Sequence, residues 1–232
     1  MLERRGLSHI EFVITFVIFV AFIVFAFVFF SPLQSGRAIK SSLDYISLEI
    51  ADFAEREMET YSVSILPGAS GDVAIDIPGI SNRINASVEN SSGEVIPSFR
   101  DSTGAVNFAM PRDNFVRVKY SSAFTNGARI LGLLIDDSMY SISSSNVDKI
   151  YFENLLLELN RSYFFNYAGL KTSFNIPNRI DFGFYVIFND GFVISSIKDV
   201  PDNVEILSTD DRVAIVRSSG EEEYATMRIM VW

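Results

Sequence analysis

The sequence predicts an α+β fold, in which a long kinked N-terminal helix precedes a β-rich, sandwich-like domain. Residues 12–30 are apolar except for Thr15, and apolar residues then recur at helical spacing as far as Tyr61. The rest of the chain consists of short alternating runs separated by turn residues. We therefore divide the chain into an N-terminal segment that ends at residue 30, residues 31–61 and residues 62–232.

The apolar run is long enough to predict a transmembrane helix. At ~1.5 Å per residue, about 19 residues span roughly 29 Å, close to the ~30 Å hydrocarbon core of a bilayer. Arg4 and Arg5 lie directly before the run, whereas Arg37 and Lys40 lie several residues beyond it. The positive-inside rule then places the N-terminus in the cytoplasm. We expect a single-pass membrane protein with residues 62–232 outside the cytoplasm, at the cell surface.

Two ordinary targeting signals account for only part of this segment. A secretory signal has a shorter apolar region followed by a small-x-small cleavage site. Here the run is longer, and the residues that follow it, SPLQSGRA, match such a site poorly. An uncleaved signal anchor explains the arginines and the run, but it leaves Gly6 and Glu11 unexplained.

The ordered combination RRG, LSHIE and FVITFV resembles the class III signal peptide of type IV pilins and their archaeal relatives. The resemblance implies that residues 1–6 are a leader, which a prepilin peptidase removes after recognising Arg5 and Gly6. Leu7 would become the new N-terminus, and Glu11 would be the family's glutamate at the fifth mature position. The resemblance further implies assembly with other pilin-like subunits through the N-terminal helix of residues 7–30.

A physical reading of Glu11 agrees with this implication. Cleavage after Gly6 would create an α-amino group on Leu7, four residues and therefore one helical turn before Glu11. The carboxylate can then pair with its own chain's amine or with that of a neighbouring subunit. The alternative is a solvated carboxylate near a helix N-terminus, where negative charge is mildly favoured.

The segment 31–61 predicts a kink followed by an amphipathic helix. Pro32 and Gly36 in SPLQSG predict the break. Beyond it, a narrow apolar seam has spacings of three and four and consists of Ile39, Leu43, Ile46, Ile50 and Phe53. The seam can pack on the chain's own domain, on neighbouring subunits, or partly on each.

Residues 62–232 predict mainly strands, with one short helix near residues 148–160. The sequences NDG (189–191) and SSGE (218–221) predict tight hairpins. The polar stretches ENSSGE and SISSSN predict exposed loops. Regular strand spacing favours a β-sandwich, and the pattern leaves open whether one body or two subdomains, around 62–125 and 165–232, form.

Three sequons, which begin at Asn85, Asn90 and Asn160, are candidate N-glycosylation sites. Asn160 is the weakest of the three, because it falls near the end of the predicted helix.

Composition excludes several functions. The net charge of -10 argues against a nucleic-acid partner. The absence of cysteine and the single histidine, His9, exclude disulfides, cysteine zinc sites and a Ser-His-Asp triad in the body. No nucleotide-binding motif is present, and the pairs Asp136–Asp137 and Asp210–Asp211 are interpreted as turn residues, not calcium ligands. We expect no enzyme activity, cofactor or metal.

The sequence therefore predicts a pilin-like subunit of a type IV pilus-type surface filament, and it favours a minor subunit over a major one. Its partners would be the membrane, a prepilin peptidase and other pilin-like subunits. The first alternative is a non-polymerising, membrane-anchored binding or adhesion protein, and the second is an ectoenzyme on a signal anchor.

Overall fold

The structure is a computed structural model that describes residues 3–68, 71–80 and 84–232; the side chains of residues 3–9 and 27–38 lie outside this description. The helices are α1 (Glu3–Ala54), the 3-10 helix η1 (Asp137–Met139), α2 (Glu153–Phe165) and α3 (Tyr167–Ser173). The strands are β1 (Glu55–Ile65), β2 (Asp72–Ile75), β3 (Asn85–Asn90), β4 (Val95–Ile96), β5 (Ser98–Arg100), β6 (Val106–Ala109), β7 (Phe115–Ser121), β8 (Leu133–Leu134), β9 (Tyr140–Phe152), β10 (Phe182–Ile187), β11 (Val193–Ser196), β12 (Leu207–Val216) and β13 (Glu222–Val231).

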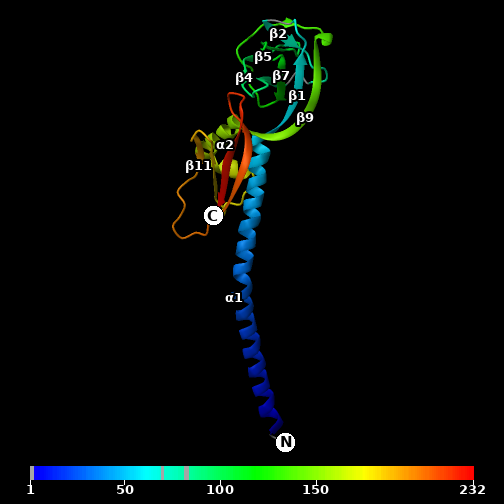
Figure 1. Cartoon of the computed structure of the whole chain (residues 1–232). Helices are drawn as coiled ribbons and strands as arrows, with labels where there is room; N and C mark the ends of the chain where they lie inside the picture. Colours follow the sequence, from blue (N-terminus) through cyan, green and yellow to red (C-terminus); the bar gives the residue numbers. More distant parts are fainter. Residues whose placement is uncertain (1–2, 69–70, 81–83) are drawn as a thin grey trace.

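Most of these strands form one curled nine-stranded sheet of order β11-β10-β13-β12-β9-β1-β7-β3-β4 (Figure 1). Its neighbours are antiparallel except β12 and β9, which run parallel and share only the pairs Ile215–Tyr151 and Val216–Phe152. A separate four-stranded sheet has the order β5-β6-β2-β8. The expected sandwich is wrong, because the long strands β1 and β9 pair along their whole length and join the two halves of the body into one sheet.

The expected kinked helix is also wrong. The backbone of α1 is helical through Pro32 and Gly36, where a break was expected, and the helix ends at Ala54 instead of Tyr61. Residues 55–61 belong to β1, where Glu55 to Tyr61 pair with Tyr151 to Ser145 of β9. Pairing with a strand far along the chain therefore overrides the local helical pattern of these residues.

The apolar seam of α1 packs on the chain's own body. Leu43, Ile46, Ile50 and Ala54 are buried against α2 and the sheet, in what we call the helical core. The other buried members of this core are Leu156, Leu159, Tyr163, Leu170, Phe174, Ile176, Phe182, Phe184, Val186, Phe188, Ile194, Ile215, Ala225, Met227, Ile229 and Val231. Along β13 every second residue from Ala225 to Val231 is buried, as expected for a strand with one face on a core.

Tyr163 lies at the centre of the helical core. It makes edge-on contacts with Tyr167, Phe182 and Phe184, and its hydroxyl donates to the carbonyl oxygen of Phe182 over 2.7 Å. Burial raises the pKa of Tyr163 to about 12.

A second core, the sheet core, lies between strands β1, β7 and β3 of the nine-stranded sheet and the four-stranded sheet. It consists of Val63, Ile65, Val73, Ile75, Ile77, Ala86, Val88, Val106, Phe108, Val116, Val118, Tyr120, Ile135 and Tyr140. A smaller junction cluster contains Met58, Phe124, Ile150, Phe152 and Val216. The body thus has two principal cores that share one continuous sheet.

Other sequence predictions meet mixed outcomes. The two predicted hairpins are confirmed: β10 and β11 turn at Gly191, and β12 and β13 turn at Gly220, both with positive φ. The short helix predicted near 148–160 begins later, at Glu153, because residues 148–152 continue β9. The predicted loop SISSSN is a strand within β9, exposed from Ser141 to Lys149.

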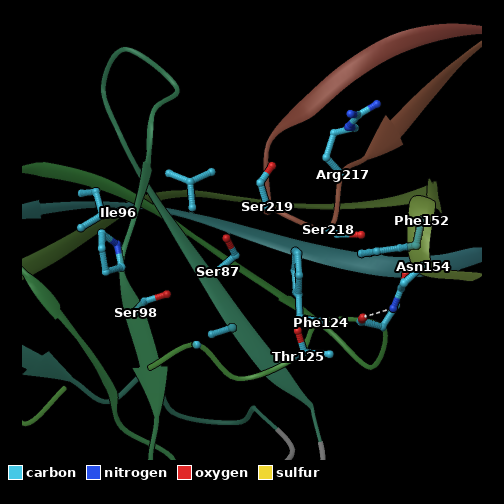
Figure 2. A pocket seen from close by; sticks show the side chains of 16 residues that line it. Ser87, Ile96, Ser98, Phe124, Thr125, Phe152, Asn154, Arg217, Ser218 and Ser219 are labelled. Carbon is cyan, nitrogen blue, oxygen red and sulfur yellow. Dashed lines mark hydrogen bonds between the residues drawn. The ribbon is translucent and has the colours of Figure 1, made fainter. Parts of the chain in front are cut away.

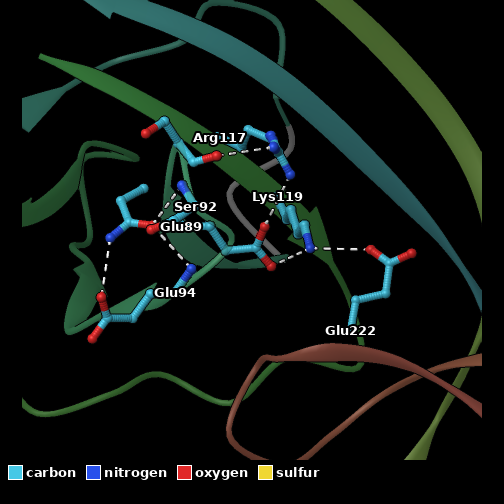
Figure 3. Close-up of polar contacts among 8 residues, drawn as sticks. Glu89, Ser92, Glu94, Arg117, Lys119 and Glu222 are labelled. Carbon is cyan, nitrogen blue, oxygen red and sulfur yellow. Dashed lines mark hydrogen bonds and ion pairs between the residues drawn. The ribbon is translucent and has the colours of Figure 1, made fainter. Parts of the chain in front are cut away.

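An ion cluster with a buried Lys119–Glu89 pair at its centre, which we call the clasp, connects the two halves of the body (Figure 3). Lys119 of β7 binds the carboxylate of Glu89 on β3 and lies 3.1 Å from Glu222 Oε2 at the start of β13. The side chains of Lys119 and Glu89 are each 3% exposed, and Arg117 Nη1 lies 3.7 Å from Glu89 Oε2. The two cations, Lys119 and Arg117, thus neutralise the two carboxylates of Glu89 and Glu222 where β13 approaches β3 and β7.

We expect Lys119→Met to destabilise the protein by about 3–5 kcal/mol, because it leaves Glu89 buried without its closest cation. Arg117→Met, on the same strand but 40% exposed, is the matched control and should cost about 1 kcal/mol or less. Urea denaturation of both variants measures the difference. Equal losses would show that the buried Lys119–Glu89 pair contributes no more to stability than the exposed contact of Arg117 with Glu89.

We expect Ile50→Ala to destabilise the body by about 2–5 kcal/mol, because Ile50 is fully buried in the helical core. Leu48→Ala should change the free energy of unfolding by about 0.5 kcal/mol or less, because Leu48 lies on the same helix and is 68% exposed. The two variants are compared by thermal and urea unfolding. If Leu48→Ala proved as costly as Ile50→Ala, α1 would dock through a different face.

Candidate assembly interface

The N-terminal part of α1 extends away from the body and carries an exposed apolar surface (Figure 1). Its exposed large side chains are Ile10, Phe12, Val13, Ile14, Phe16, Val17, Ile18, Phe19, Val20, Phe22, Ile23, Val24 and Phe25, with exposures from 37% to 71%. Because they occupy consecutive positions, they cover every side of the helix. We call residues 10–26 the apolar segment.

Two polar side chains, Glu11 and Thr15, interrupt the apolar segment. Thr15 Oγ1 donates to the main-chain carbonyl of Glu11 over 2.8 Å, so its hydroxyl is satisfied within the helix. Glu11 is exposed, and it is the only charged residue of the apolar segment. The segment therefore offers a neighbour a wide apolar surface with one carboxylate near its N-terminal end.

The prediction of a single-pass membrane protein is corrected by the structure. Within the part of the chain that the structure describes, no helix is long and apolar enough to cross a membrane.

The predicted leader lies largely outside the described side chains. Arg5, Gly6 and Leu7 belong to the helical backbone of α1, but their side chains are outside the described residues. The backbone nevertheless fixes one relation. Leu7 and Glu11 are four residues apart in one helix and so lie on the same face.

The amide nitrogens of all three sequon asparagines donate hydrogen bonds within the fold. Asn85 Nδ2 donates to the carbonyl of Phe124 over 2.8 Å, and Asn160 Nδ2 donates to the carbonyl of Ser195 over 2.7 Å. Asn90 Nδ2 lies 3.2 Å from Glu94 Oε2, in the turn between β3 and β4. Because glycosylation replaces a hydrogen on this nitrogen, modification of the folded chain would compete with these contacts.

The acidic pairs have structural partners. Asp136 Oδ1 accepts from the main-chain nitrogen of Ser138 over 2.9 Å and caps η1, and the same hydrogen bond lowers the pKa of Asp136. Asp210 binds the guanidinium of Arg228 on the neighbouring strand, which lowers the pKa of Asp210. Among the described residues, no group of three or more His, Cys, Asp or Glu side chains gathers as a metal site.

The clasp and a pocket beside it were not predicted from the sequence. Lys119 is separated from Glu89 by 30 residues and from Glu222 by 103 residues. No local spacing connects the three, and only the sheet order brings them together. In β7 the alternation places Lys119 on the face opposite to the core residues Val116 and Val118, so the sequence pattern did not show that this lysine is buried.

Comparison with protein-family models gives no match for this chain. Searches against curated proteins and against solved structures likewise give no significant match. The functional argument therefore depends on the chain's own residues.

Proposed function

We propose that this chain is a pilin-like subunit of a pilus-type filament, in which the apolar segment of α1 packs against the same segment of neighbouring copies. The observation that carries the proposal is the exposed apolar surface of residues 10–26. A helix that is apolar on all sides is normally buried, and an exposed patch of this extent marks an interaction site.

Helix α1 has a buried part and an exposed part, and this arrangement favours a second copy of the chain as the partner that covers the exposed part. The seam from Leu43 to Ala54 is already buried in the helical core and holds the helix to the body. The apolar segment projects beyond that contact, so that several copies can bring these segments together while their bodies remain outside the bundle. Apolar burial then supplies the driving force, at about 25 cal/mol per Å².

Glu11 would give the bundle its register. An unpaired carboxylate inside an apolar bundle is costly, so each Glu11 needs a cation. The α-amino group that leader cleavage would create on Leu7 is such a cation, and it can come from the same chain or from a neighbour. A prepilin peptidase is therefore the enzyme partner that the proposal requires.

We expect Glu11→Gln to be processed normally but to yield at least about tenfold fewer filaments, since the loss of about 1.4 kcal/mol per contact weakens association tenfold. The chain is co-expressed with a prepilin peptidase. Mass spectrometry then reads the N-terminus, and negative-stain electron microscopy counts filaments. Asp44→Asn is the matched control, because Asp44 is an exposed acid on the same helix outside the apolar segment.

Each readout tests a different part of the proposal. A mature chain that does not begin at Leu7 would contradict the leader. Normal filaments from Glu11→Gln would contradict the role of Glu11. If the processed chain with its native sequence formed no filaments, assembly through the apolar segment would be refuted.

A further inference from the structure

A pocket of about 300 Å³ lies where the two halves of the body meet (Figure 2). One wall comes from β3 to β5, a second from the loop after β7, and a third from the start of α2 and the β12–β13 turn. Ligand sites of proteins commonly occur at such junctions and enclose about 300–1,000 Å³. The volume therefore suits one small ligand.

Two buried serines contribute hydroxyls to this pocket. Ser87 on β3 is 6% exposed and Ser98 on β5 is 8% exposed. Neither hydroxyl has a hydrogen-bond partner among the residues that the structure describes, and Figure 2 shows both directed into the space below the β12–β13 turn. Neither oxygen is among the fully buried, unpartnered side-chain atoms of the described residues. Both hydroxyls are therefore open to the pocket and can bond a ligand there. Further hydroxyls come from Thr125, Ser218 and Ser219.

The pocket wall carries no charge that is free for a ligand. Among the described residues that line the pocket, Arg217 is the only ionisable one. Three carboxylates already surround its guanidinium. Nη2 lies 3.1 Å from Asp190 Oδ2, Nη1 lies 3.3 Å from Glu223 Oε1 without hydrogen-bond geometry, and Nε lies 3.7 Å from Glu153 Oε1. The guanidinium also stacks over Phe188 at 4.2 Å. An anionic ligand would therefore gain little binding free energy from Arg217, and a neutral ligand is favoured.

Apolar groups complete the lining. Phe124 and Phe152 meet edge-on with centroids 5.4 Å apart, and Ile96 and Pro97 lie on the β4–β5 side. Hydroxyls that can both donate and accept, beside an apolar surface and without net charge, match a ligand with several hydroxyls and an apolar C–H face. Neutral sugar rings have this chemistry.

The surrounding structure keeps the pocket in shape. A Cβ on Gly220 would lie 2.6 Å from Ser87 Oγ, and a Cβ on Gly127 would lie 2.6 Å from the carbonyl oxygen of Ser98. Asn154 Nδ2 donates to the carbonyl of Ala123 over 2.9 Å and fixes the loop after β7. The clasp holds Glu222, two residues after Gly220, against Lys119. The walls that carry the two serines are thus in place before any ligand arrives.

We propose that this junction pocket binds one ring of a neutral saccharide, with Ser87 and Ser98 as hydrogen-bonding residues. The site lies in the body and shares no residue with the apolar segment. Failure of filament assembly and failure of sugar binding are therefore separate results.

The test is titration of the full-length chain with glucose, galactose, mannose and N-acetylglucosamine, followed by amide chemical shifts in nuclear magnetic resonance. The sample contains a zwitterionic detergent, because many mild detergents carry sugar head groups that would occupy the site. We expect at least one sugar to bind with an affinity of about millimolar, typical of so small a ligand. The shifts should be confined to the pocket.

Ser98→Ala and Ser87→Ala should each weaken binding at least about tenfold without lowering the melting temperature, because neither hydroxyl has a protein partner to lose. Ser144→Ala, on the exposed stretch of β9, is the control and should bind as the native chain does. Thr125→Val provides a further pocket variant should either serine variant unfold.

Three results would overturn the proposal: no sugar shifts the pocket amides, the serine variants bind as well as the control, or the shifts lie outside the pocket. Tighter binding of a short neutral peptide, acetyl-Gly-Ser-Gly-amide, than of every sugar would also overturn the saccharide assignment.

Discussion

The docking of α1 on the body is the contact on which the remaining organisation depends. Ile46 and Ile50 are almost completely buried between α2 and the sheet, whereas Phe12 on the same helix is 71% exposed. One continuous helix of 52 residues, about 78 Å long at ~1.5 Å per residue, therefore carries two surfaces with opposite surroundings. Because the seam fixes the helix to the body, the apolar segment is held at a defined distance from it.

In the body, a single nine-stranded sheet packs against both the helical core and the sheet core. β1 and β9 extend from the sheet core to the junction cluster, and β12 joins β9 through only two residue pairs. Backbone pairing between the two halves is therefore weak beside β12. The clasp adds charge pairing where β13 approaches β3 and β7. The pocket lies next to this contact, and its polar lining follows from the turn and loop residues that meet there.

The sequence predicted features that depend on local spacing and missed those that depend on distant pairing. The seam of α1 and the turns at Gly191 and Gly220 could be read from adjacent residues, as could the single carboxylate at Glu11. The end of α1 could not, because residues 55–61 suit a helix and become a strand only through pairing with β9. The serines of β9 likewise resemble a loop until β1 lies beside them. Ser87 and Ser98 are ordinary strand residues in the sequence, and only the folded structure brings both into the lining of one pocket.

Cross-linking tests the central claim, the contact between apolar segments of different copies, most directly. The chain has no cysteine, so Phe19→Cys introduces a single thiol in the apolar segment and Ser144→Cys introduces one on the exposed body. We expect assembled Phe19→Cys chains to form disulfide-linked dimers in high yield under mild oxidation, and Ser144→Cys chains to remain largely monomeric. Equal yields at both positions, or no dimer from Phe19→Cys in assembled material, would contradict the account.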